Sequence, residues 1–349
     1  MGPGSHVRRQ KQSEISNRLT LLQTVNILVT GGAGFIGSNL LHYWTSRYPE
    51  DSVTCLDLLT YAGHMDSIKE LVDSGRIRFI RGDIRDGKAV ASAMEGMDAV
   101  IHLAAESHVD RSIASPHDFL TTNVMGTMVL LEEARRRDLK RFHHVSTDEV
   151  FGSLPLETEE KFTERSPYAP NSPYAASKAS SDHLVRAYSS TYGIRSTVTN
   201  CGNNYGPRQH PEKLIPRCLS LLLTGGKAPV YGSGRNVRDW IYVEDHCSAI
   251  DAVLHRGREG GTYLVSGGFE LSNIELVRRM VAMLGLPRER IEFVADRPGH
   301  DLRYALDDSR LRGELGWKPS WSFEDGLQST VRWYRENAGW WRPFTGAVR

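Results

Sequence analysis

The sequence predicts an α/β fold: a doubly wound, parallel, Rossmann-type sheet with a smaller C-terminal substrate-binding lobe. Three observations lead to this prediction. Short apolar runs alternate with helical patterns through about the first 200 residues, which favours a parallel sheet with helices on both faces. The run at residues 25–30 (VNILVT) leads directly into a glycine-rich loop. Beyond about residue 205 the pattern loosens, because prolines at 207, 211, 216 and 229 and a Gly-Ser-Gly turn interrupt it.

The elements follow from the spacing of apolar residues. The run at 25–30 is nearly all apolar or β-branched, as expected for a strand buried on both faces. Further strands are expected at residues 52–58, 77–80, 99–103, 141–146, 196–199 and 261–265. Helices are expected at residues 35–47, 87–94, 124–137, 273–284 and 323–337, with Ser272 as the N-cap of the fourth.

The domain organisation predicted from this pattern has three parts. Residues 1–24 comprise a tag remnant (residues 1–6) and a polar, basic N-terminal arm. Residues 25–205 form an NAD-binding Rossmann domain. Residues 206–349 form mainly the substrate-binding lobe, although some of these segments could return to the first domain.

Composition narrows the class of protein. Among 349 residues, 43 Lys and Arg balance 42 Asp and Glu, so there is no overall charge signal for nucleic acid or an anionic membrane as partner. No apolar run approaches the roughly 20 residues of a membrane-spanning helix. The four cysteines are scattered and form no CxxC pair, and no HExxH spacing occurs. We therefore expect a cytoplasmic protein without a metal site.

A dinucleotide-binding fingerprint follows the first strand. Gly31, Gly34 and Gly37 have GxxGxxG spacing and lead into a helix. The first glycine permits the tight turn, the second lets the backbone approach a pyrophosphate, and the third lets the helix pack closely on the strand. Asp57 ends the second strand, 20 residues after Gly37, where a carboxylate can bind the adenosine ribose. That carboxylate would repel a 2′-phosphate, so NAD is preferred to NADP. Asp83 and Ile84, beyond the third strand, either contact the adenine or form an ordinary turn.

Two further groups of residues point to catalysis. Tyr174 and Lys178 are four apart on a predicted helix and so share one face. A neighbouring ammonium lowers the pKa of a phenol, which would make Tyr174 a proton acceptor. Thr147, Asp148 and Glu149 follow the fifth strand, at the sheet edge where such folds bind ligands. Their environments can separate two adjacent carboxyls into an acid and a base.

Many ordered motifs extend from Val25 to about Trp317. Through them the chain resembles the extended short-chain dehydrogenase/reductases and, within that superfamily, the dTDP-glucose 4,6-dehydratase family. The motifs are TGGAGFIGS, DLLTYAG, GDIRD, HLAAESHVDRSI, STDEV, YAASK, CGNNYGP, EKLIP, RDWIYVEDH and DRPGHDLRY.

The resemblance implies a closed redox cycle with tightly bound NAD as cofactor and dTDP-glucose as substrate. Tyr174 would remove the proton of the sugar 4-hydroxyl while the C4 hydride passes to NAD. Glu149 would take the C5 proton, Asp148 would protonate the departing C6 hydroxyl, and the hydride would return to C6. Thr147 would hydrogen-bond the 4-hydroxyl, and Lys178 would hold the nicotinamide ribose.

The resemblance also implies binding residues and a homodimer, formed through the helix after Asn123 and the helix that carries Tyr174. The implied NAD contacts are Phe35, Ile36, Asp57, Leu58, Thr60, Asp83, Ile84, Leu103, Ala104, Ala105, Ser107, Thr122 and Asn204, beside the glycines, Tyr174 and Lys178. The implied substrate contacts are Ser107, Thr147, Asn203, Lys213, Leu214, Pro229, Tyr231, Arg238, Asn273, Arg297 and His300.

Other interpretations compete with this one. A 4-epimerase or a decarboxylase shares the fold, but neither needs an acid at position 148. A non-catalytic NAD-binding sensor would tend to lose Tyr174, Lys178 or the acidic pair, and all four residues are present. Elsewhere, Asp110 and Arg111 are expected to form a structural ion pair, and the late tryptophans are expected to pack the C-terminal lobe.

Overall fold

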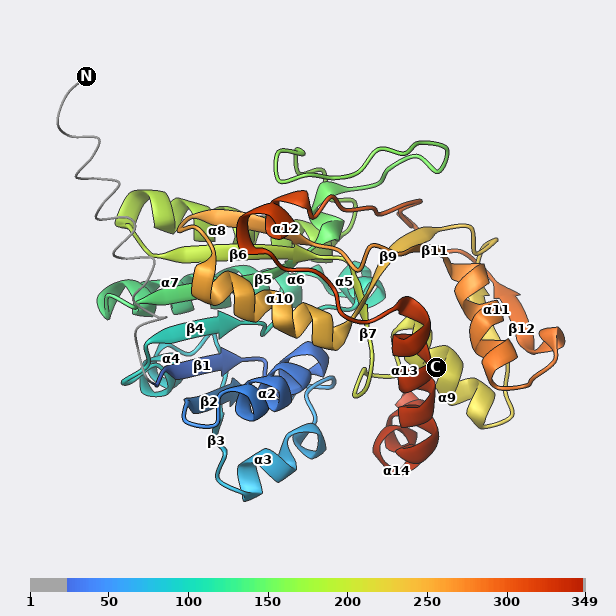
Figure 1. Cartoon of the computed structure of the whole chain (residues 1–349), viewed down its shortest axis with the longest axis horizontal. Coiled ribbons are helices and arrows are strands. Elements are labelled where there is room, and N and C mark those ends of the chain that lie inside the picture. Colours follow the sequence, from blue (N-terminus) through green and yellow to red (C-terminus); the bar gives the residue numbers. More distant parts are fainter. Residues whose placement is uncertain (1–23, 348–349) are drawn as a thin grey trace.

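The computed structural model describes residues 24–347, so the expected tag remnant and nearly all of the N-terminal arm lie outside the described residues. Within this range, a large parallel sheet has the strand order β10-β6-β5-β4-β1-β2-β3 (Figure 1). Its strands are β1 (Asn26–Thr30), β2 (Ser52–Asp57), β3 (Ile77–Arg81), β4 (Ala99–His102), β5 (Arg141–Thr147), β6 (Ser196–Cys201) and β10 (Gly261–Val265). Every strand expected from the sequence is present, and the predicted Rossmann-type sheet is confirmed.

Helices cover both faces of this sheet, as predicted (Figure 1). One core layer joins α2 and α10 to the sheet, and the other joins α4, α7 and α8 to it. Alternate residues of β1 serve the two layers: Ile27 and Val29 belong to the first and Leu28 to the second. This division explains the continuous apolar run of the strand. The helices that accompany the sheet are α2 (Phe35–Arg47), η1 (Met65–Ser67), α3 (Lys69–Asp73), α4 (Gly87–Ala93), α5 (Val109–Ala114), α6 (Pro116–Phe119), the π-helix η2 (Leu120–Met125), α7 (Gly126–Arg136), η3 (Asp148–Phe151), α8 (Pro173–Tyr192) and α10 (Val243–Arg256).

A second lobe lies beyond the carboxyl ends of the strands (Figure 1). It holds a three-stranded sheet, β11-β9-β7, and a two-stranded sheet, β12-β8. Trp341, Trp240 and Tyr334 are buried in its core, with Trp321, Trp333 and Trp340 packed against them. Trp321, Trp333, Trp340 and Trp341 therefore pack in this lobe as predicted, whereas the prediction is wrong for Trp317, which packs against α10 and β10 beside the large sheet. The elements are β7 (Asn203–Tyr205), α9 (Leu214–Leu223), β8 (Ala228–Tyr231), β9 (Val237–Tyr242), β11 (Glu270–Ser272), α11 (Asn273–Met283), η4 (Arg288–Arg290), β12 (Ile291–Val294), α13 (Phe323–Glu336), α14 (Ala338–Trp341) and η5 (Arg342–Ala347). The late helix α12 (Ser309–Leu315) instead packs against α10 and β10 of the large sheet.

The chain passes between the two lobes more than once. After β9 in the second lobe it returns through α10, and β10 then pairs with β6 at the edge of the large sheet. The segment from Val243 to Val265 is thus part of the large sheet and its helical cover. The cleft between the lobes consequently has walls from segments far apart in the sequence.

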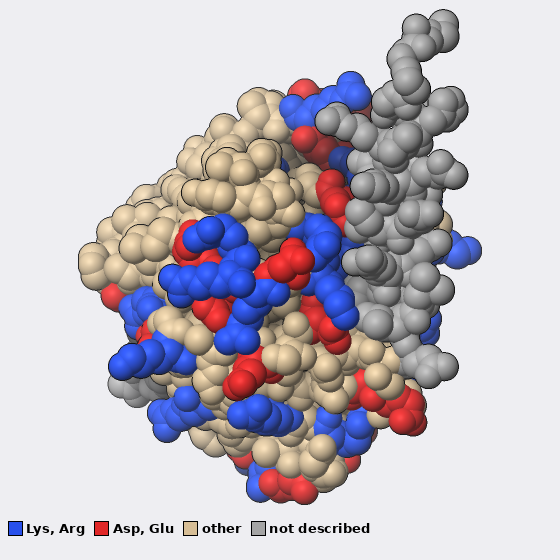
Figure 2. All heavy atoms as spheres, turned by 90° about the vertical axis from the view of Figure 1, so that its left-hand side faces the viewer, with Lys and Arg blue, Asp and Glu red and all other residues tan. Residues whose placement is uncertain are grey.

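Charges of both signs are interspersed on the surface. The face shown in Figure 2 carries Lys and Arg next to Asp and Glu. Near the end of α7, Arg135 pairs with Glu132 at 2.9 Å, and Lys140 pairs with Asp98 at 2.6 Å. None of the helices in residues 24–347 is long and apolar enough to cross a membrane.

Candidate active site

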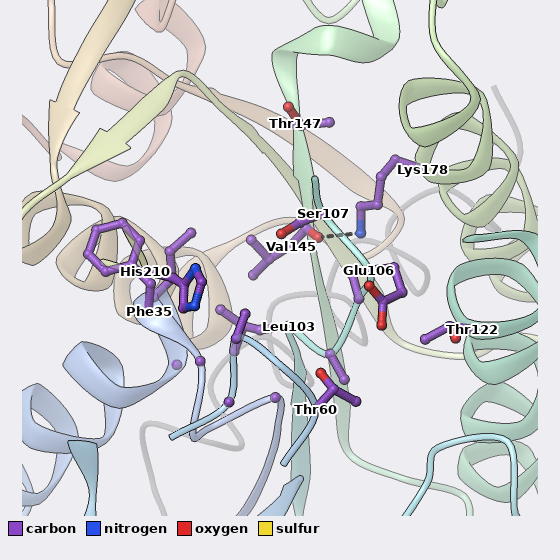
Figure 3. A pocket seen from close by; sticks show the side chains of 18 of the residues that line it. Phe35, Thr60, Leu103, Glu106, Ser107, Thr122, Val145, Thr147, Lys178 and His210 are labelled. Carbon is purple, nitrogen blue, oxygen red and sulfur yellow. Dashed lines mark hydrogen bonds between the residues drawn. The ribbon is translucent and has the colours of Figure 1, made fainter. Parts of the chain in front are cut away.

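A cavity of about 320 Å³ opens at the carboxyl ends of the parallel strands. The strand order reverses beside β1, because β2 and β3 lie on one side of it and β4 on the other; open α/β sheets bind ligands at such a point. Figure 3 shows the pocket extending from Thr147 and Lys178 at one end to Thr60 at the other. All the residues proposed to contact the cofactor line this cavity. So do four of the proposed substrate contacts, namely Ser107, Thr147, Asn203 and Lys213.

The glycine-rich loop after β1 forms one wall. Gly31 has φ +74°, and a Cβ there would lie 2.6 Å from the backbone nitrogen of Ala104. A Cβ on Gly37 would lie 2.7 Å from the Cα of Gly32, so only glycine lets α2 pack this closely on the loop. No side chain caps the N-terminus of α2 at Gly34. Its backbone N–H groups remain available for the negative charge of a pyrophosphate.

Asp57 fixes the neighbouring wall at the end of β2. Its two carboxylate oxygens accept hydrogen bonds from the backbone N–H of Ala33 at 2.9 Å and of Leu59 at 2.8 Å. Burial raises the pKa of this carboxyl, and the two hydrogen bonds act against the increase. The carboxylate therefore joins β2 to the glycine-rich loop and is held at the place where a ribose diol would bind.

The acidic pair lies where β5 ends and η3 begins. The hydroxyl of Thr147 accepts a hydrogen bond from the backbone N–H of Glu149 at 3.3 Å and donates one to Asp148 Oδ1 at 3.3 Å. Asp148 is only 2% exposed, and its Oδ2 has no hydrogen-bond partner among the described residues. Burial, together with the negative charges of Glu149 and Asp239, raises the pKa of Asp148 well above its usual range. Asp148 therefore tends to keep its proton and can act as an acid.

Glu149 has a different electrostatic environment, although it is adjacent. Burial raises its pKa as well, but three cations, Lys213, Arg297 and Arg238, act in the opposite direction. Opposite charges nearby favour the ionised carboxylate. Both carboxyls have raised pKa values, but only that of Asp148 is well above its usual range, so Asp148 is the better proton donor of the two and Glu149 the better base.

Tyr174 and Lys178 lie near the start of α8, both buried. Pro173 is the first residue of the helix, and the hydroxyl of Ser172 caps the N–H of Ala175 at 3.1 Å. The prediction that Lys178 lowers the pKa of Tyr174 is wrong for this structure. Burial and the negative charge of Glu149 raise the pKa of the phenol well above 10.

Lys178 instead turns toward β5. Its ammonium donates a hydrogen bond to the carbonyl oxygen of Val145 at 2.8 Å, drawn as a dashed line in Figure 3. Burial lowers the pKa of Lys178 to about 8. Spacing along a helix places two side chains on one face, but the nearest acceptor, here a strand carbonyl, decides where a long side chain points.

The remaining proposed substrate contacts lie outside the cavity wall, mostly in the second lobe. Leu214 begins α9, Pro229 and Tyr231 are in β8, Arg238 is in β9, Asn273 begins α11, and Arg297 and His300 follow β12. Arg238 stacks on the ring of Tyr304 with its guanidinium carbon 4.3 Å from the ring centre. The expected ion pair between Asp110 and Arg111 is wrong. Asp110 lies 3.6 Å from Arg297, and Arg111 stacks over Tyr61 at 3.8 Å, because tertiary partners outcompete a sequence neighbour.

The cavity also has lining residues that sequence reasoning did not single out, including Glu106, His210 and Glu212. Glu212 is buried, which raises its pKa, and the hydroxyl of Tyr61 donates to its Oε1 at 3.4 Å. Glu106 is in the HLAAESHVDRSI motif and Glu212 opens the EKLIP motif. Sequence reasoning could have found Glu106 and Glu212 because both lie inside these motifs.

A Rossmann-type sheet, a GxxGxxG loop, an Asp at the end of β2 and a Tyr-x-x-x-Lys helix together define an extended short-chain dehydrogenase/reductase. Comparisons with known proteins narrow this class. The family model described as GDP-mannose 4,6 dehydratase matches residues 28–330. The dTDP-glucose 4,6-dehydratase of Mycobacterium tuberculosis H37Rv is 50% identical over 325 residues, covering 93% of this chain and 97% of its own.

Solved structures agree with this result. DesIV, a dTDP-glucose 4,6-dehydratase from Streptomyces venezuelae with NAD bound, superposes with a TM-score of 0.89 at 51% identity, covering 91% of this chain and 99% of its own. A UDP-glucose 4-epimerase from Thermus thermophilus, in complex with NAD, is more distant: its TM-score is 0.82 at 31% identity, covering 89% and 99%. The chain belongs to the dTDP-glucose 4,6-dehydratase family.

Proposed function

We propose that this chain converts dTDP-glucose into dTDP-4-keto-6-deoxyglucose and water, with tightly bound NAD as cofactor. The observation that carries the proposal is the acidic pair at the end of β5: a buried, proton-holding Asp148 beside a Glu149 that three cations favour as an anion. Elimination of water needs an acid and a base together. Oxidation alone needs neither of these two groups.

The cavity suits a dinucleotide. The uncapped N-terminus of α2 and the close approach allowed by Gly31 provide a cradle for the pyrophosphate. Asp57 would hold the adenosine ribose, and Lys178 the nicotinamide ribose. When bound, NAD would supply the redox chemistry, namely uptake of a hydride from C4 of the sugar and its return to C6.

The protein side chains move the protons in the proposed cycle. The phenolate form of Tyr174, which the raised pKa makes the minor form, would take the proton of the 4-hydroxyl, which Thr147 holds by a hydrogen bond. The resulting C4 ketone acidifies the C5 hydrogen, which Glu149 removes, while Asp148 gives its proton to the C6 hydroxyl so that water leaves. When the hydride returns to C6, Glu149 gives its proton back to C5. Transfer of a proton from Tyr174 to Asp148 then restores both groups.

Positive side chains would bind the diphosphate of the substrate. Arg238 and Arg297 are proposed for this role, because a guanidinium makes charge-assisted, bidentate bonds to phosphate. The other proposed contacts in the second lobe would hold the nucleoside and its phosphates: Leu214, Pro229, Tyr231, Asn273 and His300. Lys213, Asn203 and Ser107 would contact the sugar from the cavity wall.

An assay with Asp148→Asn tests the proposal. The wild-type protein should turn dTDP-glucose into a product with the strong ultraviolet absorbance of a 4-keto sugar in alkali. The variant should still oxidise C4, which is seen as the absorbance of the reduced form of the nicotinamide. Its product should form at least 100-fold more slowly. Unslowed water loss in the variant would refute the acid role of Asp148. A wild-type protein that inverts C4 without losing water would establish the alternative, a 4-epimerase.

We also propose that the enzyme is a homodimer that works in the cytoplasm. Ile113, Leu120, Met125 and Tyr192 are between 44% and 53% exposed on α5, η2 and α8, and α8 packs against both α5 and η2. Exposed apolar patches of this kind support a docking face for a second copy. All four cysteines are buried and unpaired, as suits a reducing compartment.

A further inference from the structure

A buried polar network lies directly behind Lys178, on the side away from the cavity. His144 of β5 and Asp182 of α8 are both fully buried. The Nε2 atom of His144 lies 3.3 Å from the ammonium of Lys178 and 3.2 Å from Oδ1 of Asp182. One imidazole nitrogen therefore stands between a cation and an anion.

The surroundings of Asp182 favour its ionised form. Its other oxygen, Oδ2, accepts hydrogen bonds from the hydroxyl of Tyr168 at 2.7 Å, from Ser146 at 2.9 Å and from the amide of Asn200 at 3.1 Å. Burial acts to raise the pKa of this carboxyl, but His144, Lys178 and the hydrogen bonds outweigh it, so the pKa is lowered. Three donors on one oxygen leave Oδ1 free to face His144 and the charge of Lys178.

The other titratable groups around Lys178 are neutral near pH 8. Burial lowers the pKa of His144 to about 4, and it lowers the pKa of His102 on β4 well below 6.5. Burial raises the pKa of Cys201 on β6 and, with Glu149, that of Tyr174. Asp182 is consequently the ionised group that faces Lys178 within this buried cluster.

We infer that Asp182, which faces Lys178 across the neutral imidazole of His144, is the counter-ion that keeps Lys178 protonated and fixes the position of its ammonium. The inference rests on the proposed role of Lys178 in holding the nicotinamide ribose. Nε2 accepts a hydrogen bond from the ammonium and so cannot also donate one to Oδ1. The Asp182 carboxylate acts on the ammonium through space and offsets the cost of burying that charge. Both residues are positioning residues, because neither lines the cavity.

The test compares Asp182→Asn with Tyr168→Phe. Both variants disturb the same hydrogen-bond network, but only the first removes a charge. In Asp182→Asn the pKa of Lys178 should fall, so the alkaline limb of the kcat/KM profile for dTDP-glucose should move to lower pH by about one unit, giving a roughly tenfold loss of activity at pH 9. In Tyr168→Phe the limb should stay at its wild-type position, and Asp182→Glu should restore it.

The inference is overturned if the alkaline limb of the kcat/KM profile does not move in a folded Asp182→Asn enzyme. It is also overturned if this limb moves equally in Asp182→Asn and Tyr168→Phe. If Asp182→Asn does not fold, His144→Leu replaces it. Loss of the imidazole acceptor should move the limb in the same direction, and an unmoved limb again overturns the inference.

A second readout does not depend on catalysis. The holoenzyme is labelled with ¹³C-lysine, and the Lys178 signal is assigned as the one absent from Lys178→Arg. Its titration should give a pKa of about 8 in the wild type and a lower one in Asp182→Asn. If the wild type lacks dehydratase activity while this difference is found, the proposed function fails and the counter-ion role stands.

Discussion

The ammonium of Lys213 donates a hydrogen bond to the carbonyl oxygen of Ser107 at 2.6 Å, which joins the start of α9 in the second lobe to the loop after β4. This contact crosses the cleft and holds the cation near Glu149. The charge of Lys213 is the largest of the influences that lower the pKa of Glu149 against its burial. A lobe–lobe contact thus helps to set the protonation of the proposed base.

Replacing Lys213 by Met should raise the pKa of Glu149. Because Glu149 must be ionised to take the C5 proton, the acid limb of the kcat profile should move to higher pH by about one unit. The measurement is kcat for 4-keto sugar formation between pH 5 and 8. Lys227→Met is the matched control, because Lys227 is exposed; its profile should coincide with the wild type. Coincident acid limbs for both variants would contradict the role of Lys213.

Gly37→Ala should disturb the cofactor cradle. A methyl group there would lie 2.7 Å from the Cα of Gly32, so the loop or α2 must shift, at a cost of about 1–3 kcal/mol. The free energy of unfolding in urea and the NAD content of the purified protein should both fall. Gly313→Ala in α12 meets no atom within 4 Å and should stabilise the protein by about 0.5–1 kcal/mol with NAD content unchanged. A Gly37→Ala protein with full NAD content would argue against close packing at this turn.

Asp57 should decide between NAD and NADP. The protein stripped of cofactor should regain activity with NAD and very little with NADP, because a 2′-phosphate would meet the Asp57 carboxylate. In Asp57→Ser this repulsion disappears, so the ratio of NAD to NADP affinity should fall at least tenfold by titration calorimetry. An unchanged ratio would remove Asp57 from cofactor discrimination.

The His255–Asp251 pair should make stability depend on pH. Nδ1 of His255 lies 2.7 Å from Oδ1 of Asp251, and although burial acts to lower the pKa of His255, this contact raises it. A His pKa raised by folding gives stability that is complete below pH 6.5 and is lost as pH rises through the folded value. The wild type should therefore lose about 0.5 kcal/mol more than His255→Gln between pH 6 and pH 8 in urea unfolding. Equal losses would show that the contact with Asp251 does not raise the pKa of His255.

The exposed apolar residues of η2 should be required for dimerisation. Light scattering should give the mass of two chains for the wild type and of one chain for Leu120→Asp combined with Met125→Asp. Phe293→Asp is the control, because Phe293 is 59% exposed on β12 of the second lobe, and it should remain dimeric. A monomeric wild type would refute the proposed homodimer.

The sequence alone determined the strands of the large sheet and the glycine-rich turn with Asp57, and both follow from local patterns. Most other cavity residues were expected only from the resemblance to a family, and Glu106, His210 and Glu212 were not expected at all. The apolar run at β1 reflects burial on both faces, and the spacing of Gly31, Gly34 and Gly37 reflects the turn between β1 and α2. Each pattern is contained in a short stretch of chain, so it can be recognised without knowing which segments meet.

The tertiary structure alone decided the electrostatics. Asp148 and Glu149 are neighbours in sequence, yet what separates their pKa values is the arrival of Lys213 and Arg297 from the second lobe, which act on Glu149. Likewise, the spacing of Tyr174 and Lys178 predicted a shared face but not that Lys178 would turn to Val145 and His144. A pKa depends on burial and on charges brought close by folding, and neither can be read from the order of residues along the chain.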